Sequence, residues 1–232
     1  MTLFFILAVS ILLAHDTWLY PLLDRLGTVD LTTGNRFPES EIGPPQERIA
    51  SLSALADGVH IEPSTLEFHP TTLRVTFDKD PNCVEARLHP HPIELGRETI
   101  RGYLEGERAV SLLDGSPLPE VVRERYTKCC KLISGMSDSE VGHPLEIIRA
   151  GPDRWTLLRE GKPLAGSVIR AYSETGDLVE AISDSTGAIQ LELRQDTTWM
   201  LRAHHIQRSN EPGFDFESWW CSLVVAQKGR VH

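Results

Sequence analysis

The downstream part of the chain carries short apolar runs at regular intervals. Turn-forming residues separate the runs, which are PLEIIRA, RWTLLREG, SVIRAYSE, LVEAISDS, AIQLELR, TWMLRAHHIQ and WWCSLVVAQ. Short strands with regular turn signals are typical of antiparallel β-sandwiches. The pattern therefore predicts a β-sandwich from about residue 141 onward.

In the first part of the chain, apolar residues recur with two different periods, one typical of strands and one of helices. Leu73, Val75 and Phe77 alternate with polar residues, which predicts a strand with one buried face. Apolar residues at helical spacing predict an exposed helix over residues 97–107. The segment LPEVVRER, residues 118–125, favours the start of a second helix, although the alternation in YTKCCKLIS, residues 126–134, favours a strand. The charges of RERYTK, residues 123–128, indicate a solvated or salt-bridged helix end.

These patterns together predict a mainly β protein. We expect two β-sandwich-like domains of immunoglobulin or transthyretin type, with one or two short helices inserted in the first. The expected boundaries are residues 15–140 for the β-rich first domain and residues 141–232 for the second.

The first 14 residues, MTLFFILAVSILLA, are apolar and carry no charged side chain. A membrane-spanning helix needs about 20 such residues, whereas the hydrophobic region of a secretory signal peptide is shorter. We therefore predict a signal peptide at residues 1–14, cleaved after Ala14, and a periplasmic or extracellular protein that begins at His15. The alternative is an uncleaved anchor. The rest of the chain holds no second hydrophobic span.

Net charge and cysteine spacing exclude two kinds of binding. The chain has 23 Lys and Arg against 33 Asp and Glu, a net charge of -10, so it has no electrostatic attraction to nucleic acid. Its four cysteines form no C-x-x-C motif, which argues against a thiolate zinc site and leaves the disulfide state open. They are Cys83, Cys129, Cys130 and Cys221; we expect the adjacent pair either to be half-buried in a strand or to pair with different cysteines.

Histidines supply the candidate metal ligands. After cleavage, His15 would offer an imidazole and an α-amine, whose pKa near 7.7 makes its deprotonation at pH 7 cost only about 1 kcal/mol. A second nitrogen donor is needed, and His204 and His205 offer two. Adjacent strand residues point to opposite faces, so only one can join His15. Asp16 and Glu217 are candidate oxygen donors or partners that orient an imidazole.

Signals for catalysis are weak. The chain has no G-x-S-x-G, no H-E-x-x-H and no phosphate-binding glycine loop, so we expect no enzyme activity. An amino-terminal histidine with a second histidine also occurs in copper-dependent oxidative polysaccharide enzymes, which resemble this chain only at that constellation.

Several segments together resemble a known family. They are HDTWLYP, NRFPESE, ERYTKCCKLI, GHPLEII, GKPLAGSVIRAYSETGDLVEAISDSTGAIQLEL, WMLRAHHI and ESWWCSLVV. The chain resembles a bacterial exported domain-of-unknown-function family that is often labelled a periplasmic nickel-uptake, nickel or cobalt transport-linked, component. The resemblance implies a second domain similar to the carboxypeptidase-regulatory sandwich, and it favours His205 as the ligand that joins His15. The adjacent cysteines depart from the family pattern.

Two functions follow as expectations. The first is an exported metal-binding protein of the cell envelope, which takes up or buffers a divalent transition metal and serves a membrane cation importer. Nickel or cobalt is expected from the resemblance, while imidazole and amine donors also suit copper and zinc. The alternative is a non-catalytic adhesion or assembly module that binds protein or glycan.

Overall fold

The computed structural model describes residues 15–115, 117–135 and 140–226. The predicted signal peptide lies outside the described residues. The chain folds as a mainly β protein of the β-sandwich type, which confirms the predicted fold class. In the described part of the chain, no helix has both the length and the apolar character needed to cross a membrane.

A large central sheet organises the fold. Its strands run in the order β14-β13-β16-β17-β9-β7-β3-β4, and β8 also pairs with β9. The bounds are β3 (Ile49–Ala56), β4 (Val59–Ile61), β7 (Cys83–Leu88), β8 (His91–Gly96), β9 (Val121–Ser134), β13 (Val168–Ser173), β14 (Leu178–Ile182), β16 (Trp199–Arg208) and β17 (Phe216–Ala226).

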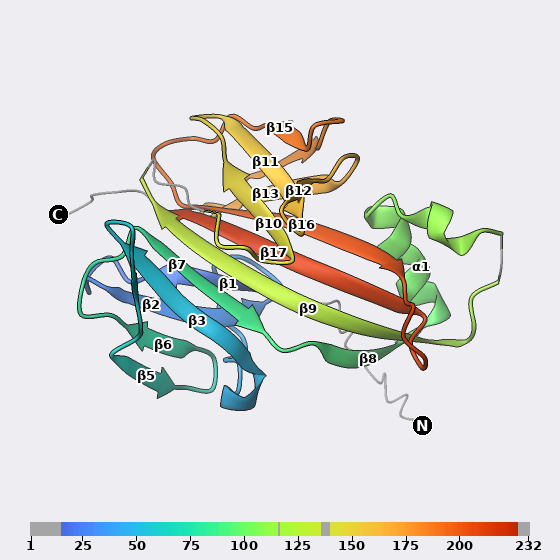
Figure 1. Cartoon of the computed structure of the whole chain (residues 1–232), viewed down its shortest axis with the longest axis horizontal. Helices are drawn as coiled ribbons and strands as arrows, with labels where there is room; N and C mark the ends of the chain where they lie inside the picture. Colours follow the sequence, from blue (N-terminus) through green and yellow to red (C-terminus); the bar gives the residue numbers. More distant parts are fainter. Residues whose placement is uncertain (1–14, 116, 136–139, 227–232) are drawn as a thin grey trace, which may run out of the picture.

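Two smaller sheets cover the opposite faces of the central sheet (Figure 1). The first outer sheet has the order β1-β2-β6-β5, formed by β1 (Asp16–Pro21), β2 (Thr28–Gly34), β6 (Leu73–Thr76) and β5 (Thr65–Phe68). The second outer sheet contains β10 (Leu145–Arg149), β11 (Arg154–Arg159), β12 (Lys162–Pro163) and β15 (Ala188–Gln190). The molecule is therefore a three-layered β structure.

Side chains of β9 point alternately to the two faces of the central sheet, so the strand contributes to two hydrophobic cores. Cys130 and Leu132 belong to the core beneath the first outer sheet, whereas Cys129 and Ile133 belong to the core beneath the second. Successive strand residues point to opposite faces, so a strand covered on both sides buries its side chains on both faces, as β9 does at residues 127–133. The adjacent cysteines are therefore fully buried rather than half-buried, and burial raises the pKa of the Cys130 thiol to about 12.

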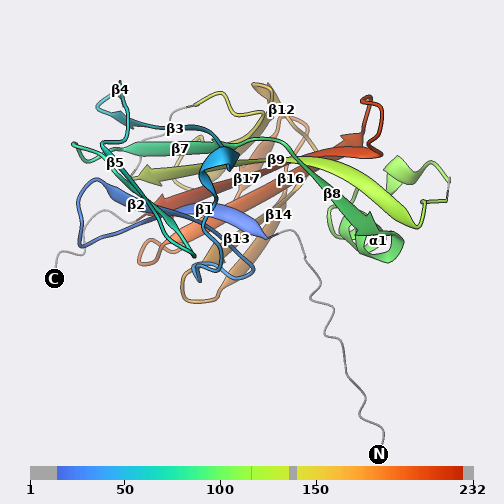
Figure 2. The ribbon, with the colours of Figure 1, turned by 90° about the horizontal axis from the view of Figure 1, so that it is seen from below.

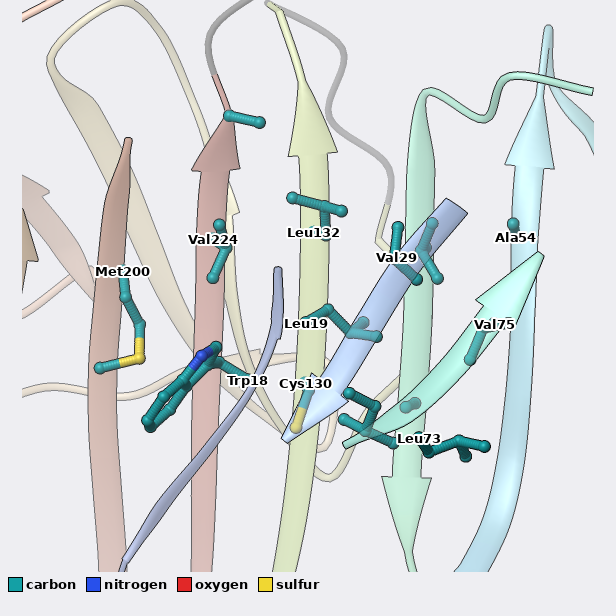
Figure 3. Close-up of a cluster of buried hydrophobic side chains, with 14 of the residues drawn as sticks. Trp18, Leu19, Val29, Ala54, Leu73, Val75, Cys130, Leu132, Met200 and Val224 are labelled. Carbon is teal, nitrogen blue, oxygen red and sulfur yellow. The ribbon is translucent and has the colours of Figure 1, made fainter. Parts of the chain in front are cut away.

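The core beneath the first outer sheet is built around β1. Figure 3 shows Trp18 and Leu19 lying over the central strands that carry Met200, Val224 and Cys130. The predicted strand at Leu73, Val75 and Phe77 is confirmed, and all three of its apolar side chains are buried in this core.

Strands from both predicted domains meet in the central sheet. β17 pairs with β9 in parallel, from Phe216 opposite Glu124 to Ala226 opposite Ser134. The sheet therefore continues across the predicted boundary at residue 140, and the division into two domains stays a prediction.

The predicted helix at residues 97–107 is confirmed as α1 (Arg97–Gly106), which lies beside β8 at one end of the long strands (Figure 2). Its buried face, Ile100 and Leu104, packs against Val122 and Phe216 of the central sheet. Short 3₁₀ helices η1 (Gln46–Arg48) and η2 (Val110–Leu113) complete the element order.

The helix expected in residues 118–125 is wrong. β9 begins at Val121, and it pairs with β8 on one edge and with β17 on the other. These two partners satisfy the backbone hydrogen bonds of the segment and override its local helical pattern. The expected helix end at RERYTK is wrong too, because the segment lies on this strand with Glu124 and Lys128 buried, although Arg123 and Arg125 do form ion pairs.

Candidate functional site

A cavity of about 1100 Å³ lies on the face of the central sheet that also carries the first outer sheet. We call it the sheet cavity. Its floor consists of Glu124 and Tyr126 of β9, Arg202 of β16 and Trp220 of β17. α1 forms one side, and the start of β1 with residues 35–37 forms another. The cavity therefore fills the gap that the first outer sheet and α1 leave over the central strands.

The wall formed by α1 is unusually open. Glu98, Gly102 and Gly106 follow one another at four-residue spacing on the cavity side of the helix. A Cβ atom added at Gly102 or Gly106 would meet no atom within 4 Å. Glycine inside a helix costs roughly 0.5–1 kcal/mol relative to alanine. Gly102, inside the helix, therefore lowers helix stability, and both glycines leave the space beside α1 free of side-chain atoms.

Four charged residues form an ion network along the cavity wall: Asp16, Glu107, Arg170 and Arg202. Arg202 contacts the Asp16 carboxylate at 3.2 Å and the Glu107 carboxylate at 3.1 Å. Arg170 contacts Glu107 at 2.8 Å and donates to the Gly106 carbonyl, which ties the carboxyl end of α1 to the central sheet. Burial raises the pKa of Asp16 although Arg202 and Lys128 oppose the shift.

Three rings from three elements pack together beside the ion network. They are Tyr103 of α1, His204 of β16 and Trp220 of β17, with ring centroids 4.2–5.4 Å apart, and we call them the aromatic stack. The Tyr103 hydroxyl is hydrogen-bonded to His204 Nε2. Burial lowers the pKa of His204 well below its ordinary value, so the imidazole is neutral at pH 7.

Glu124 is the buried carboxylate of the floor, and it is only 3% exposed. The Ser218 hydroxyl donates a hydrogen bond to it, and the Trp220 indole N–H donates to Ser218 Oγ at 3.2 Å. Within residues 15–115, 117–135 and 140–226, no Lys, Arg or His side chain forms an ion pair with Glu124. Burial raises the pKa of Glu124 to about 6. At pH 7 Glu124 is therefore mostly ionised and has no ion-pair partner in the described chain, although Arg202 lies on the same floor.

The structure separates the predicted histidine ligands. His204 points toward the sheet cavity as part of the aromatic stack, whereas His205 points to the opposite face and stacks on Trp219 at 6.0 Å. Glu217 is also on that opposite face, where it forms an ion pair with Arg125. Strand alternation produces this separation, as the sequence predicted for adjacent histidines.

His15 lies on the cavity side of the central sheet. Its carbonyl accepts a hydrogen bond from Lys128 Nζ, and its Nδ1 is 3.5 Å from a Glu41 carboxylate oxygen. The structure therefore does not bring His15 together with His205 or Glu217. Among the described residues, no three His, Cys, Asp or Glu side chains converge as ligands for one metal ion.

Sequence reasoning missed the residues that line the cavity floor. The available signal was the alternation within β16 and β17, where polar or aromatic side chains share one face. Arg202 and His204 lie opposite Ser222 and Trp220, respectively, on that face. A purely structural strand would carry aliphatic residues there, so such a polar row on a buried face indicates a site.

Fold and site together define the class: a β-sandwich-type protein with an open cavity over its central sheet. No family model matches the chain, and no curated protein matches its sequence. The family resemblance stays a prediction, and the functional proposals below depend on the geometry of the site.

Proposed function

We propose that this protein is a non-catalytic binding protein that holds a small organic ligand in the sheet cavity. The observation that carries the proposal is the cavity itself, whose volume of about 1100 Å³ is at the upper end of small-molecule sites. Apolar and aromatic side chains supply much of its lining, and eight charged side chains, several of them paired with one another, also line it. Ligand pockets typically combine an apolar lining with polar groups that fix the orientation of the ligand.

The anchoring of the walls supports a pre-formed pocket. α1 is held by its buried face and by the contacts of Arg170 with Gly106 and Glu107. Arg202 links the start of β1 to the same helix through Asp16 and Glu107. A pocket with fixed walls requires little reorganisation on binding, which favours affinity.

Filling the cavity tests the proposal. We expect Gly102→Trp to weaken binding of the neutral dye Nile red at least tenfold, because the indole would project from an open position of the cavity wall. Arg101→Trp adds the same side chain one position earlier in α1, where the residue is exposed and outside the cavity. This variant should leave the affinity unchanged. Dye fluorescence titrations measure both. The proposal fails if the parent protein binds neither this dye nor small cationic, neutral or anionic organic probes, or if both variants bind the dye as the parent does.

Metal binding is a second candidate, favoured by one observation at His15. The buried Nδ1 atom of His15 has no hydrogen-bond partner among the described residues and lies near the Glu41 carboxylate. An imidazole and a carboxylate suit a divalent transition metal such as nickel, cobalt, copper or zinc. In this candidate role an exported protein would deliver the ion to a cation importer, and the α-amine of a processed His15 would supply a further donor.

Native mass spectrometry with added nickel or copper tests the second candidate. We expect protein that begins at His15 to bind one ion and His15→Ala to lose it. His60→Ala removes an exposed histidine of β4 and serves as the matched control. Retention of the ion by His15→Ala, or no uptake by the parent protein, would contradict metal binding at His15.

A further inference from the structure

We propose that the sheet cavity selects an organic cation, whose positive group pairs with the carboxylate of Glu124 while its apolar part contacts the aromatic lining. This inference rests on the proposed function, since it names the chemical class of the ligand held in the same cavity. It assigns Glu124 as the specificity-determining residue.

The charges that line the cavity favour a cation. In the ion network, the two guanidinium groups are matched by the carboxylates of Asp16 and Glu107. Arg170 also pairs with Glu180 at 2.9 Å. Glu124 has no cationic partner in the described chain, and Glu98 adds a second carboxylate on α1. Arg36 and Asp177 also line the cavity and pair with Glu39 and Arg194, respectively, so the lining has five carboxylates against three guanidinium groups.

Other ligand charges fit this lining poorly. An anion would compete with Asp16 or Glu107 for Arg170 or Arg202, or with Glu39 for the exposed Arg36, and the cavity that it entered also holds the unpaired Glu124. A neutral ligand would bury Glu124 further without supplying a counter-charge, which is unfavourable for a carboxylate in an apolar site. A cation compensates the charge of Glu124 directly.

The aromatic lining suits the same ligand. Tyr103, Tyr172 and Trp220 all contribute to the cavity surface. Cations are attracted to the faces of aromatic rings, and quaternary ammonium groups are commonly held in aromatic sites. Trp220 already takes part in such a contact, because the Arg202 guanidinium lies 5.6 Å from its ring centroid. Trp220 itself is only 6% exposed, so a cationic ligand can use the carboxylate together with the partly exposed rings of Tyr103 and Tyr172.

The protonation of Glu124 gives the site a pH signature. Its pKa of about 6 makes it ionised at pH 7.5 and mostly protonated at pH 5. The groups that face it keep their charge over this range. Tyr103 and Tyr126 stay neutral because burial raises each pKa, and His204 stays neutral because burial lowers its pKa. Arg202 stays charged.

Three isosteric probes separate the charge from the shape of the ligand. Choline is the cation, 3,3-dimethylbutan-1-ol is its neutral counterpart and 3,3-dimethylbutanoate is the anion. Isothermal titration calorimetry at pH 7.5 should show choline binding at least tenfold more tightly than either of the others. At pH 5 the affinity for choline should fall by about tenfold, as the ionised fraction of Glu124 falls.

Glu124→Gln tests the assigned residue with nearly unchanged side-chain size. We expect it to lose at least tenfold in affinity for choline and to keep the affinity for the neutral alcohol. Glu94→Gln, on exposed β8 and outside the cavity, is the matched control and should bind choline normally. The choline affinities of the parent protein at pH 7.5 and pH 5 test the same residue without a variant, so the result does not depend on how well the variant folds.

The outcomes separate this inference from the function on which it rests. Binding of the alcohol or the anion at least as tightly as choline, or choline binding that is insensitive to both pH 5 and Glu124→Gln, would overturn the cation assignment. The cation assignment would also be overturned if the protein binds no choline but binds Nile red, and Gly102→Trp weakens the binding of the dye. Failure of Nile red and all three probes to bind would overturn the cavity function itself.

Discussion

Lys131→Met is expected to lower the free energy of unfolding by about 3–5 kcal/mol, because it leaves the carboxylate of Glu146 buried without a cation. Lys131 and Glu146 are each only 2% exposed, and their charged atoms lie 2.8 Å apart. Glu146 also accepts hydrogen bonds from the backbone N–H groups of Val141, Gly142 and His143. The pair thereby ties residues 141–143 to the central sheet.

Urea denaturation followed by tryptophan fluorescence measures this loss. Arg123→Met is the matched control, because it breaks the exposed ion pair between Arg123 and Glu94, whose side chains are 60% and 63% exposed. Such surface pairs contribute about 0–1 kcal/mol, so the control should change stability little. A loss below about 1 kcal/mol for Lys131→Met would contradict the role given to this buried pair.

Glu124→Gln is expected to make the protein more stable at neutral pH, in contrast to Lys131→Met. The folded-state pKa of Glu124 is about 6 and its ordinary value is 4.5. Between these values the folded state binds more protons than the unfolded state, so this group makes stability fall as the pH rises from about 4.5 through 6. The difference of 1.5 pKa units corresponds to about 2 kcal/mol.

Urea denaturation at pH 4 and pH 7.5 measures this dependence. Other groups titrate in the same range, so the informative quantity is the variant's stability minus that of the parent protein. We expect this difference to rise by about 2 kcal/mol between the two pH values. Glu94→Gln, which removes an exposed carboxylate, should show no such rise. A constant difference, or one that falls with pH, would contradict the assigned titration of Glu124.

The loss of folding stability that ionised Glu124 causes favours a binding role for this residue. A carboxylate that destabilises the folded protein above pH 6 is not retained for packing, since a glutamine of similar size would avoid the cost. Groups with strongly shifted pKa values in cavities are often functional, because binding sites commonly sacrifice stability. The stability and binding measurements on the same variant therefore complement each other.

Local patterns in the sequence were sufficient for the fold class and for several elements. The strand at Leu73, Val75 and Phe77 and the helix α1 follow from periods of two and 3.6 residues, which are properties of the chain segment itself. The placement of His204 and His205 on opposite faces follows from the same strand geometry. These predictions needed no knowledge of distant contacts.

Only the tertiary structure decided the conformation of residues 118–125 and the site itself. The segment becomes a strand because β8 and β17, the latter about 90 residues away in the chain, pair with its two edges. The same pairing buries Glu124, whose sequence neighbours are charged, and places it beside Tyr103 and Trp220. Burial then raises its pKa, while the hydrogen bond from Ser218 opposes the shift. Both depend on which distant strands become neighbours, and local periodicity carries no information about that.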